Sequence, residues 1–148
     1  MGLALIRYVW NDPTAKRGKK GTIVAKVLII DDSGFQRKWI AKAVEALGHD
    51  TVEAADGQQG LELVEREKPD CITVDLNMPN MDGLQFLANM EGRNQSAPVI
   101  VVTADIQADT KTQCEELGAR AFVNKPFKPD ELQNALTACL TKQLKRSE

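Results

Sequence analysis

The sequence is poor in the residues that build disulfide frameworks and Cys/His metal sites. Its 148 residues include three cysteines and a single histidine. Cys71, Cys114 and Cys139 lie far apart, and no CxxC motif or histidine-rich spacing surrounds them. We therefore expect reduced, mostly buried thiols in a cytosolic protein. The histidine, His49, follows a predicted helix end in the stretch LGHD, and we expect it to be a solvated loop residue.

Long hydrophobic runs are also missing. The most apolar terminal stretch, LALIRYVW at residues 3–10, is interrupted by Arg7 and is followed by Asn-Asp-Pro instead of a small-residue cleavage site. It is too short and too broken for a signal peptide or a membrane-spanning helix. The sequence thus predicts a cytoplasmic protein with no membrane partner.

A strong excess of one charge is absent, although the charges are unevenly distributed. The chain has 19 basic and 21 acidic residues, for a formal net charge of −2. Six of the basic residues but only one acidic residue precede residue 27, so the remainder carries 13 basic and 20 acidic residues. An acidic body argues against a nucleic-acid-binding face. The basic run KRGKK at residues 16–20 is interpreted as a solvated linker.

From residue 25 onward, short β-branched runs alternate with segments of helical periodicity. The five runs are VLII at 27–30, TVEA at 51–54, CITVD at 71–75, PVIVVT at 98–103 and AFVN at 121–124. The first helical segment carries its apolar period on Phe35, Trp39, Ala43, Val44 and Leu47. Five strands alternating with five helices predict an α/β fold, in which helices cover both faces of a parallel sheet.

This pattern divides the chain into three parts. We expect an N-terminal extension at residues 1–24, weakly ordered or acting as a docking arm, then one domain at 25–142 and a short C-terminal tail at 143–148. Because fewer than ten residues follow the last predicted helix, we expect no output domain.

Charged and hydroxyl residues stand where the predicted strands end. They are Asp31, Asp32, Asp75, Thr103 and Lys125. In an open parallel sheet the ligand site lies outside the carboxyl ends of the strands, so we expect these side chains to meet at one edge. Clustered carboxylates repel one another unless a cation joins them, and Mg²⁺ suits oxygen ligands. The alternative is a solvated turn in which Asp32 or Ser33 only caps the next helix.

These residues together resemble the receiver domain of two-component response regulators, most closely the stand-alone chemotaxis type. The matching motifs are Asp31-Asp32-Ser33, VDLNMPNMDG at 74–83, Thr103-Ala104 and Lys125-Pro126-Phe127. The resemblance covers about 115 residues. It implies a flavodoxin-like, doubly wound sheet of five parallel strands in the order 2-1-3-4-5, with five helices.

The resemblance also implies a role for each residue of the site. Asp75 would accept a phosphoryl group, and Asp31 and Asp32 would hold Mg²⁺ together with Asp75 and the main-chain carbonyl of Asn77. Thr103 and Lys125 would bind phosphoryl oxygens. Small Ala104 would leave room for the phosphodonor, and a cis peptide would precede Pro126.

A signalling switch follows from the same resemblance. Thr103 and Phe122 would move together on phosphorylation and reshape a protein-binding face formed by the fourth helix, fifth strand and fifth helix, at about 106–117 and 120–140. The sequence thus predicts a single-domain response regulator, a monomer or weak dimer. It would be phosphorylated by a histidine kinase, would bind a downstream target protein, and would catalyse no metabolic reaction.

Three other functions compete with this hypothesis. A phosphorelay shuttle or phosphate sink would use the same residues with different partners. An aspartyl-phosphate hydrolase of the haloacid dehalogenase type needs a second aspartate two residues after the nucleophile, where this chain has Asn77. A flavodoxin-like electron carrier is disfavoured because the loop at 31–34 is anionic where a flavin phosphate needs amides and hydroxyls.

Overall fold

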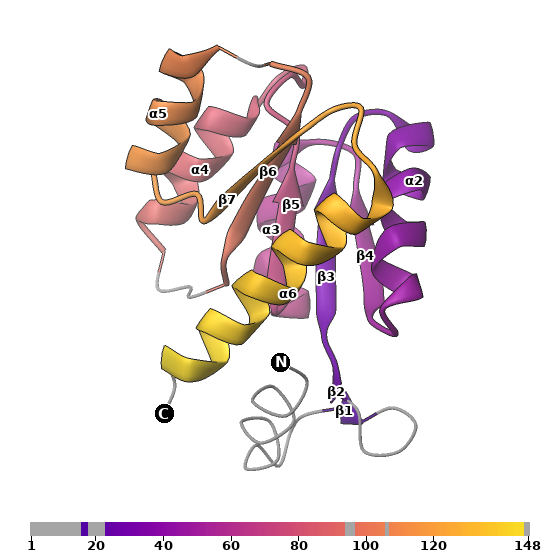
Figure 1. Cartoon of the computed structure of the whole chain (residues 1–148). Helices are drawn as coiled ribbons and strands as arrows, with labels where there is room; N and C mark the ends of the chain where they lie inside the picture. The colour runs from indigo at the N-terminus through magenta and orange to yellow at the C-terminus, as the bar shows by residue number, and fades with distance from the viewer. Residues whose placement is uncertain (1–15, 18–22, 94–96, 106, 147–148) are drawn as a thin grey trace.

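The structure is a computed structural model that describes residues 16–17, 23–93, 97–105 and 107–146. Helices lie on both faces of a central sheet, and a small strand pair precedes it (Figure 1). The strands are β1 (Lys16–Arg17), β2 (Ile23–Val24), β3 (Lys26–Ile30), β4 (Asp50–Ala54), β5 (Cys71–Val74), β6 (Val99–Thr103) and β7 (Ala121–Asn124). The helices are α2 (Gly34–Ala46), α3 (Gly57–Glu67), α4 (Gly83–Glu91), α5 (Ala108–Glu116) and α6 (Pro129–Arg146).

The central sheet has five parallel strands in the order β4-β3-β5-β6-β7. Counted from β3, this is the order 2-1-3-4-5, so the predicted fold class and strand order are confirmed. The chain winds outward first to β4 and then back across β3 to β5. The strand order therefore reverses at β3. The carboxyl end of β3 lies between the carboxyl ends of β4 and β5.

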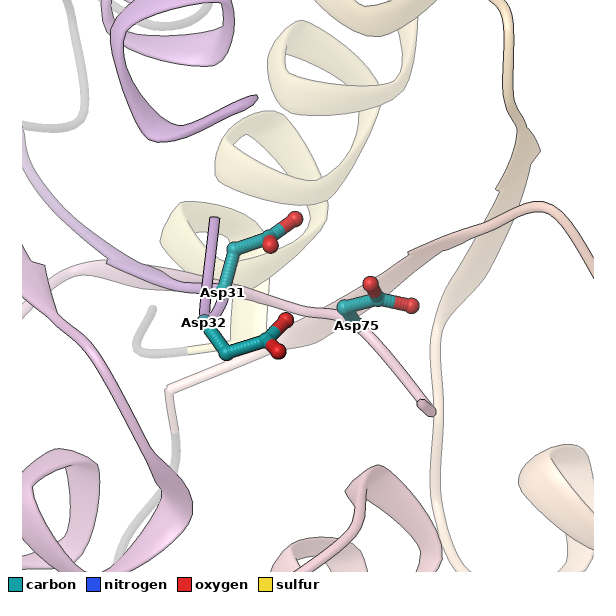
Figure 2. A group of neighbouring side chains, drawn as sticks. All are labelled: Asp31, Asp32 and Asp75. Atoms are coloured by element: carbon teal, nitrogen blue, oxygen red, sulfur yellow. The ribbon is translucent and has the colours of Figure 1, made fainter. Parts of the chain in front are cut away.

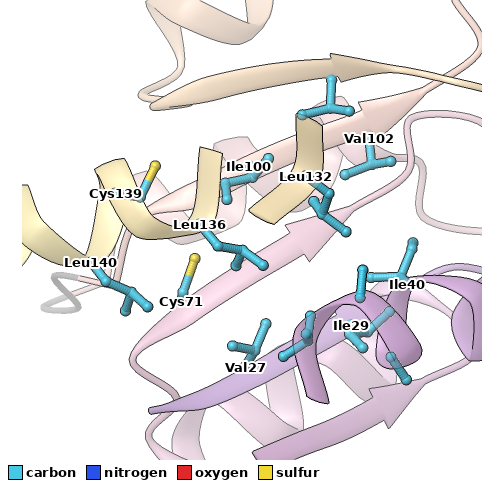
Figure 3. Packing of buried hydrophobic residues seen from close by; sticks show 14 of the residues in the cluster. Val27, Ile29, Ile40, Cys71, Ile100, Val102, Leu132, Leu136, Cys139 and Leu140 are labelled. Atoms are coloured by element: carbon cyan, nitrogen blue, oxygen red, sulfur yellow. The ribbon is translucent and has the colours of Figure 1, made fainter. Parts of the chain in front are cut away.

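Alternating side chains of the strands pack against helices on opposite faces. One face is covered by α2 and α6, whose apolar side chains meet those of the strands in Figure 3. The other is covered by α3, α4 and α5. Each central strand contributes to both clusters, as a sheet buried on both sides requires: β3 places Val27 and Ile29 in the first cluster and Leu28 and Ile30 in the second. Among the described residues, no helix combines the length and hydropathy needed to cross a membrane.

Side-chain caps start three of the helices at the site end of the sheet. The Ser33 hydroxyl accepts a hydrogen bond from the amide of Gln36, and Asp56 accepts one from Gln59. Asp82 forms a reciprocal capping box with Gln85 at the start of α4. These caps fix where the loops between strands and helices end.

Both ends of the described chain contain secondary structure that the sequence did not predict. Strands β1 and β2 pair antiparallel, with Lys16 opposite Val24. The rest of the proposed extension, residues 1–15 and 18–22, lies outside the described residues, so its role as an arm stays a prediction. At the other end, α6 runs to Arg146, so helix continues through 143–146, where we expected a tail.

The expected burial of the cysteines is confirmed, whereas the prediction of a solvated histidine is wrong. Cys71, Cys114 and Cys139 are all reduced and buried. His49 is buried at 8% exposure, and its Nδ1 accepts a 3.0 Å hydrogen bond from the amide of Ala25. His49 therefore contacts the chain directly before β3. Its position in a polar loop sequence does not indicate this long-range contact. Burial lowers the pKa of His49, against the opposing charges of Asp70 and Asp50.

Acid should therefore weaken the fold through His49. Because the pKa of His49 is lower in the folded than in the unfolded chain, the unfolded chain binds the extra proton first as pH falls. The stability from neutral His49 is complete above its unfolded pKa and is lost as pH falls through the folded value. Urea unfolding at about pH 7.5 and about pH 5.5 should show a smaller loss for His49→Gln than for the wild type. Equal losses in the two proteins would contradict this assignment.

Candidate functional site

Three carboxylates converge at the carboxyl ends of adjacent strands. Asp31 and Asp32 follow β3, and Asp75 follows β5, which is the neighbour of β3. One carboxylate oxygen of each residue lies within 4.8 Å of those of the other two. Figure 2 shows the side chains of Asp31 and Asp32 extending toward Asp75. Asp31 and Asp75 are buried, at 1% and 9% exposure, whereas Asp32 is exposed.

A lysine from a more distant strand completes this cluster. Lys125 follows β7, and its Nζ lies 2.7 Å from Asp31 Oδ2 and 3.1 Å from Asp75 Oδ2. Its amide donates to the carbonyl of Thr103, and the peptide between Lys125 and Pro126 is cis, as predicted. Burial alone would lower the pKa of Lys125, but its hydrogen bonds and charge interactions with Asp31 and Asp75 outweigh burial and raise it. Lys125 is thus a partly buried cation shared by two carboxylates.

Asp31 is held through both its side chain and its main chain. Its Oδ1 accepts a 2.9 Å hydrogen bond from the amide of Ser33, and its amide donates to Ala54. Its carbonyl oxygen accepts a 2.6 Å hydrogen bond from Arg37 Nη1. Ser33 also caps α2, so the competing interpretation as a helix-capping turn is correct for Ser33 but does not account for the placement of Asp31. Sequence reasoning missed Arg37.

Thr103 lies at the end of β6, between β5 and β7. It is fully buried, and its hydroxyl oxygen accepts a 3.3 Å hydrogen bond from the amide of Asp105. Ala104, which follows it, is exposed. The carboxylate of Asp105 in turn accepts hydrogen bonds from the amide of Gln107 and the hydroxyl of Thr110. The Thr103 hydroxyl is therefore linked through Asp105 to the start of α5.

The loop after β5 folds back tightly over Asp75. The amide of Asn77 lies 3.3 Å from Asp75 Oδ1, and the amide of Gly83 donates to the carbonyl of Leu76. A side chain at position 83 would not fit, because its Cβ would lie 2.6 Å from the carbonyl oxygen of Asp75. Asn77 itself is exposed. Glycine in the MDG end of the motif thus lets α4 start against the acceptor loop.

Phe122 lies away from the acidic cluster. It is in β7, in register with Val101 of β6, and is partly buried against the apolar cluster on the α3, α4 and α5 side of the sheet. Its proposed link to Thr103 therefore runs across the β6–β7 pair.

A groove of about 470 Å³ adjoins the cluster at Lys125. It is lined by Phe35, Gln36, Trp39, Ala104, Lys125, Pro126 and Phe127. Phe35 and Trp39 belong to the apolar period of the first helix, and they are 75% and 43% exposed. They lie one turn apart on α2, so periodicity places them together without showing that the helix turns them outward. The largest exposed apolar side chains in the described part of the chain thus border the site.

The donor set of the cluster fits a hard divalent cation. Three carboxylates within a few ångströms supply oxygen ligands and more negative charge than the single ammonium of Lys125 neutralises. Mg²⁺ prefers oxygen ligands and an incomplete protein shell, and the exposed position of Asp32 gives access from solvent. Within this cluster, the carboxylate of Asp75 can also act as a nucleophile.

Comparisons with known proteins agree with this geometry. A family model described as the response regulator receiver domain matches residues 27–137. Sporulation initiation phosphotransferase F of Bacillus subtilis is 35% identical, over 75% of this chain and 90% of its own length. The chemotaxis protein CheY of Listeria monocytogenes is 37% identical, over 75% of this chain and 94% of its own. The solved structure of chemotaxis protein CheY4 of Vibrio cholerae is 30% identical with a TM-score of 0.73, covering 78% of this chain and 98% of that one.

Proposed function

The chain belongs to the response regulator receiver domain family, and on this basis we propose that Asp75 accepts a phosphoryl group from a histidine kinase in a Mg²⁺-dependent reaction. The observation that carries the proposal is the joint placement of the Asp31, Asp32 and Asp75 carboxylates with the ammonium of Lys125. The four residues come from the ends of three strands. A capping turn alone would not bring them together.

In the proposed reaction, a carboxylate oxygen of Asp75 attacks the phosphorus of a phosphohistidine. The new O–P bond forms as the N–P bond breaks, and the electron pair of the N–P bond stays on the imidazole nitrogen. Asp31, Asp32, Asp75 and the carbonyl of Asn77 would hold Mg²⁺, which supplies positive charge that offsets the phosphoryl oxygens. Lys125 would move its hydrogen bond from Asp75 to a phosphoryl oxygen.

The phosphorylated state would then be communicated through Thr103 and Phe122. The Thr103 hydroxyl would leave the amide of Asp105 and bind a phosphoryl oxygen. Because Asp105 contacts the start of α5, this movement would alter α5, and Phe122 would turn into the vacated space. The face of α5, β7 and α6 would thereby change its affinity for a target protein. The chain would act as a cytoplasmic signalling module, a monomer or weak dimer, with no turnover of a metabolite.

The exposed groove supports an approach route for the phosphodonor. Phe35 and Trp39 border Lys125 and Ala104, so a protein surface seated there would also cover the entrance to Asp75. Neighbouring Lys38 and Lys42 are exposed on α2, which favours a donor surface that combines apolar and acidic residues. The same placement supports a phosphorelay shuttle as the second candidate, because such a protein passes the phosphoryl group between partners at this entrance.

The experiment compares two phosphodonors in the presence of Mg²⁺. The wild type should be labelled both by acetyl phosphate and by a phosphorylated histidine kinase, and EDTA should abolish both reactions. Phe35→Ser should react normally with acetyl phosphate but on the order of tenfold more slowly with the kinase, because it loses an apolar protein contact. Exposed Leu47, at the far end of α2, supplies the matched control Leu47→Ser. Failure of the wild type to react with either donor would contradict the proposed function.

A further inference from the structure

Arg37, on the first turn of α2, makes two contacts that point to a role in the site. Its Nη1 donates a 2.6 Å hydrogen bond to the main-chain carbonyl oxygen of Asp31, and its Nε lies 2.9 Å from Glu53 Oε1. The Arg37 side chain is 20% exposed, so these contacts are partly shielded from water. A hydrogen bond from a guanidinium is stronger than one between neutral groups. The residue thus ties α2 to the ends of β3 and β4.

The carbonyl that Arg37 binds belongs to the peptide unit between Asp31 and Asp32. A peptide unit is planar, so a fixed carbonyl oxygen sets the direction of the whole plane. The Cα atoms of Asp31 and Asp32 lie at the two ends of that plane. Its orientation therefore helps to set the directions in which the two side chains leave the backbone, and here both extend toward Asp75 (Figure 2).

The other contacts of this acidic pair involve other atoms: the amide of Ser33 donates to Asp31 Oδ1, and the amide of Asp31 donates to the carbonyl of Ala54. One oxygen of the Asp31 carboxylate is paired with Lys125, and this ion pair must weaken when a divalent cation takes its place. Asp32 is exposed, so packing restrains its side chain less than that of Asp31. Arg37 acts on the main chain, and its hydrogen bond can persist while the side chains change partners.

We propose that Arg37 is a positioning residue for the cation site, holding the Asp31–Asp32 peptide unit so that both carboxylates can bind Mg²⁺ together with Asp75. Glu53, at the end of β4, orients the guanidinium. The inference rests on the proposed Mg²⁺ site and adds a residue that lies outside it. Arg37 differs in role from the residues of the cluster, because it would touch neither the ion nor the phosphoryl group.

The positive charge of Arg37 would by itself have the opposite effect. A guanidinium near the site repels a divalent cation, so its removal would tighten Mg²⁺ binding if charge alone mattered. If positioning dominates, removal weakens binding, because loss of a residue that orients a metal ligand typically costs on the order of tenfold or more in affinity. The sign of the change therefore distinguishes the two effects.

The test is the Mg²⁺ dissociation constant, measured by calorimetric titration of the full chain. Arg37→Met should weaken binding by about tenfold. Arg37→Lys keeps the charge but cannot bridge both partners, so it should weaken binding by a smaller factor. Arg93→Met is the matched control, because it also breaks an Arg–Glu ion pair, with Glu65. Arg93 follows the end of α4 that is opposite to the Asp75 loop, so the dissociation constant should stay unchanged.

Thermal unfolding of the same proteins separates positioning from general stability. Saturating Mg²⁺ should raise the melting temperature of Arg37→Met less than that of the wild type or Arg93→Met, whatever their melting temperatures without the ion. If Arg37→Met does not fold, Glu53→Gln and Arg37→Lys carry the same test. Tighter or unchanged binding in the Arg37 variants overturns the inference alone. Absence of Mg²⁺ binding in the wild type overturns the proposed function with it.

Discussion

Asp75→Asn should abolish labelling by acetyl phosphate in the presence of Mg²⁺. The change removes the nucleophile, because an amide oxygen does not form a stable acyl phosphate, and it also removes one of three negative charges that would attract the cation. The fold should survive, since Asp75 is only at the margin of the core and asparagine has the same shape and can still accept a hydrogen bond from Lys125. Intact-mass spectrometry should show one added phosphoryl group in the wild type and none in the variant.

The matched control for Asp75→Asn is Asp109→Asn. Asp109 is an exposed carboxylate in the first turn of α5, so its replacement changes the net charge by the same amount without touching the cluster. Asp109→Asn should be labelled at the wild-type rate. Hydroxylamine should release the group from both labelled proteins, as expected for an acyl phosphate. Undiminished labelling of Asp75→Asn, or a hydroxylamine-resistant product in the wild type, would show that the acceptor is another residue.

The fold was predictable because its signals are local and repeated. Apolar runs of strand length alternate with helical periods, and the strand ends carry Asp31, Asp75 and Thr103 in the order that a parallel sheet brings together. The strand order itself came from the motifs, since periodicity does not say which strands are neighbours. With this strand order the motif residues meet at one edge of the sheet. Lys125 can form its ion pairs with Asp31 and Asp75 because all three residues lie at that edge.

What the sequence did not reveal depends on contacts between distant segments. His49 lies in a polar loop sequence, and only the docking of that loop on residue 25 buries it. Phe35 and Trp39 follow the period of a buried helix face, but they are exposed and line a groove with Ala104 and residues 125–127. Arg37 looks like one more surface charge on a helix until the carbonyl of Asp31 and the carboxylate of Glu53 are placed beside it.

Lys125 should have opposite effects on the two steps of the proposed reaction. Its ammonium lies 2.7 Å from Asp31 and 3.1 Å from Asp75, in the position of a cation that competes with Mg²⁺ for the same oxygens. Its side chain is only 13% exposed, so solvent screens this competition little. Once Asp75 is phosphorylated, however, the same ammonium is the group that can bind a phosphoryl oxygen and stabilise the active state.

Lys125→Met should therefore bind Mg²⁺ more tightly while responding less to phosphorylation. We expect a gain in Mg²⁺ affinity of about tenfold, which corresponds to about 1.4 kcal/mol. This is well below the interaction energy of roughly 4 kcal/mol between two unit charges at 4 Å and an effective dielectric of 20. Beryllofluoride, which mimics the phosphoryl group, should in turn cause smaller amide shifts in α5 and β7 than in the wild type. Lys128→Met, which removes an exposed charge three residues later, should change neither quantity. Weaker Mg²⁺ binding in Lys125→Met would mean that Lys125 orders the carboxylates more than it competes for them, and would reverse the role assigned to its ion pairs.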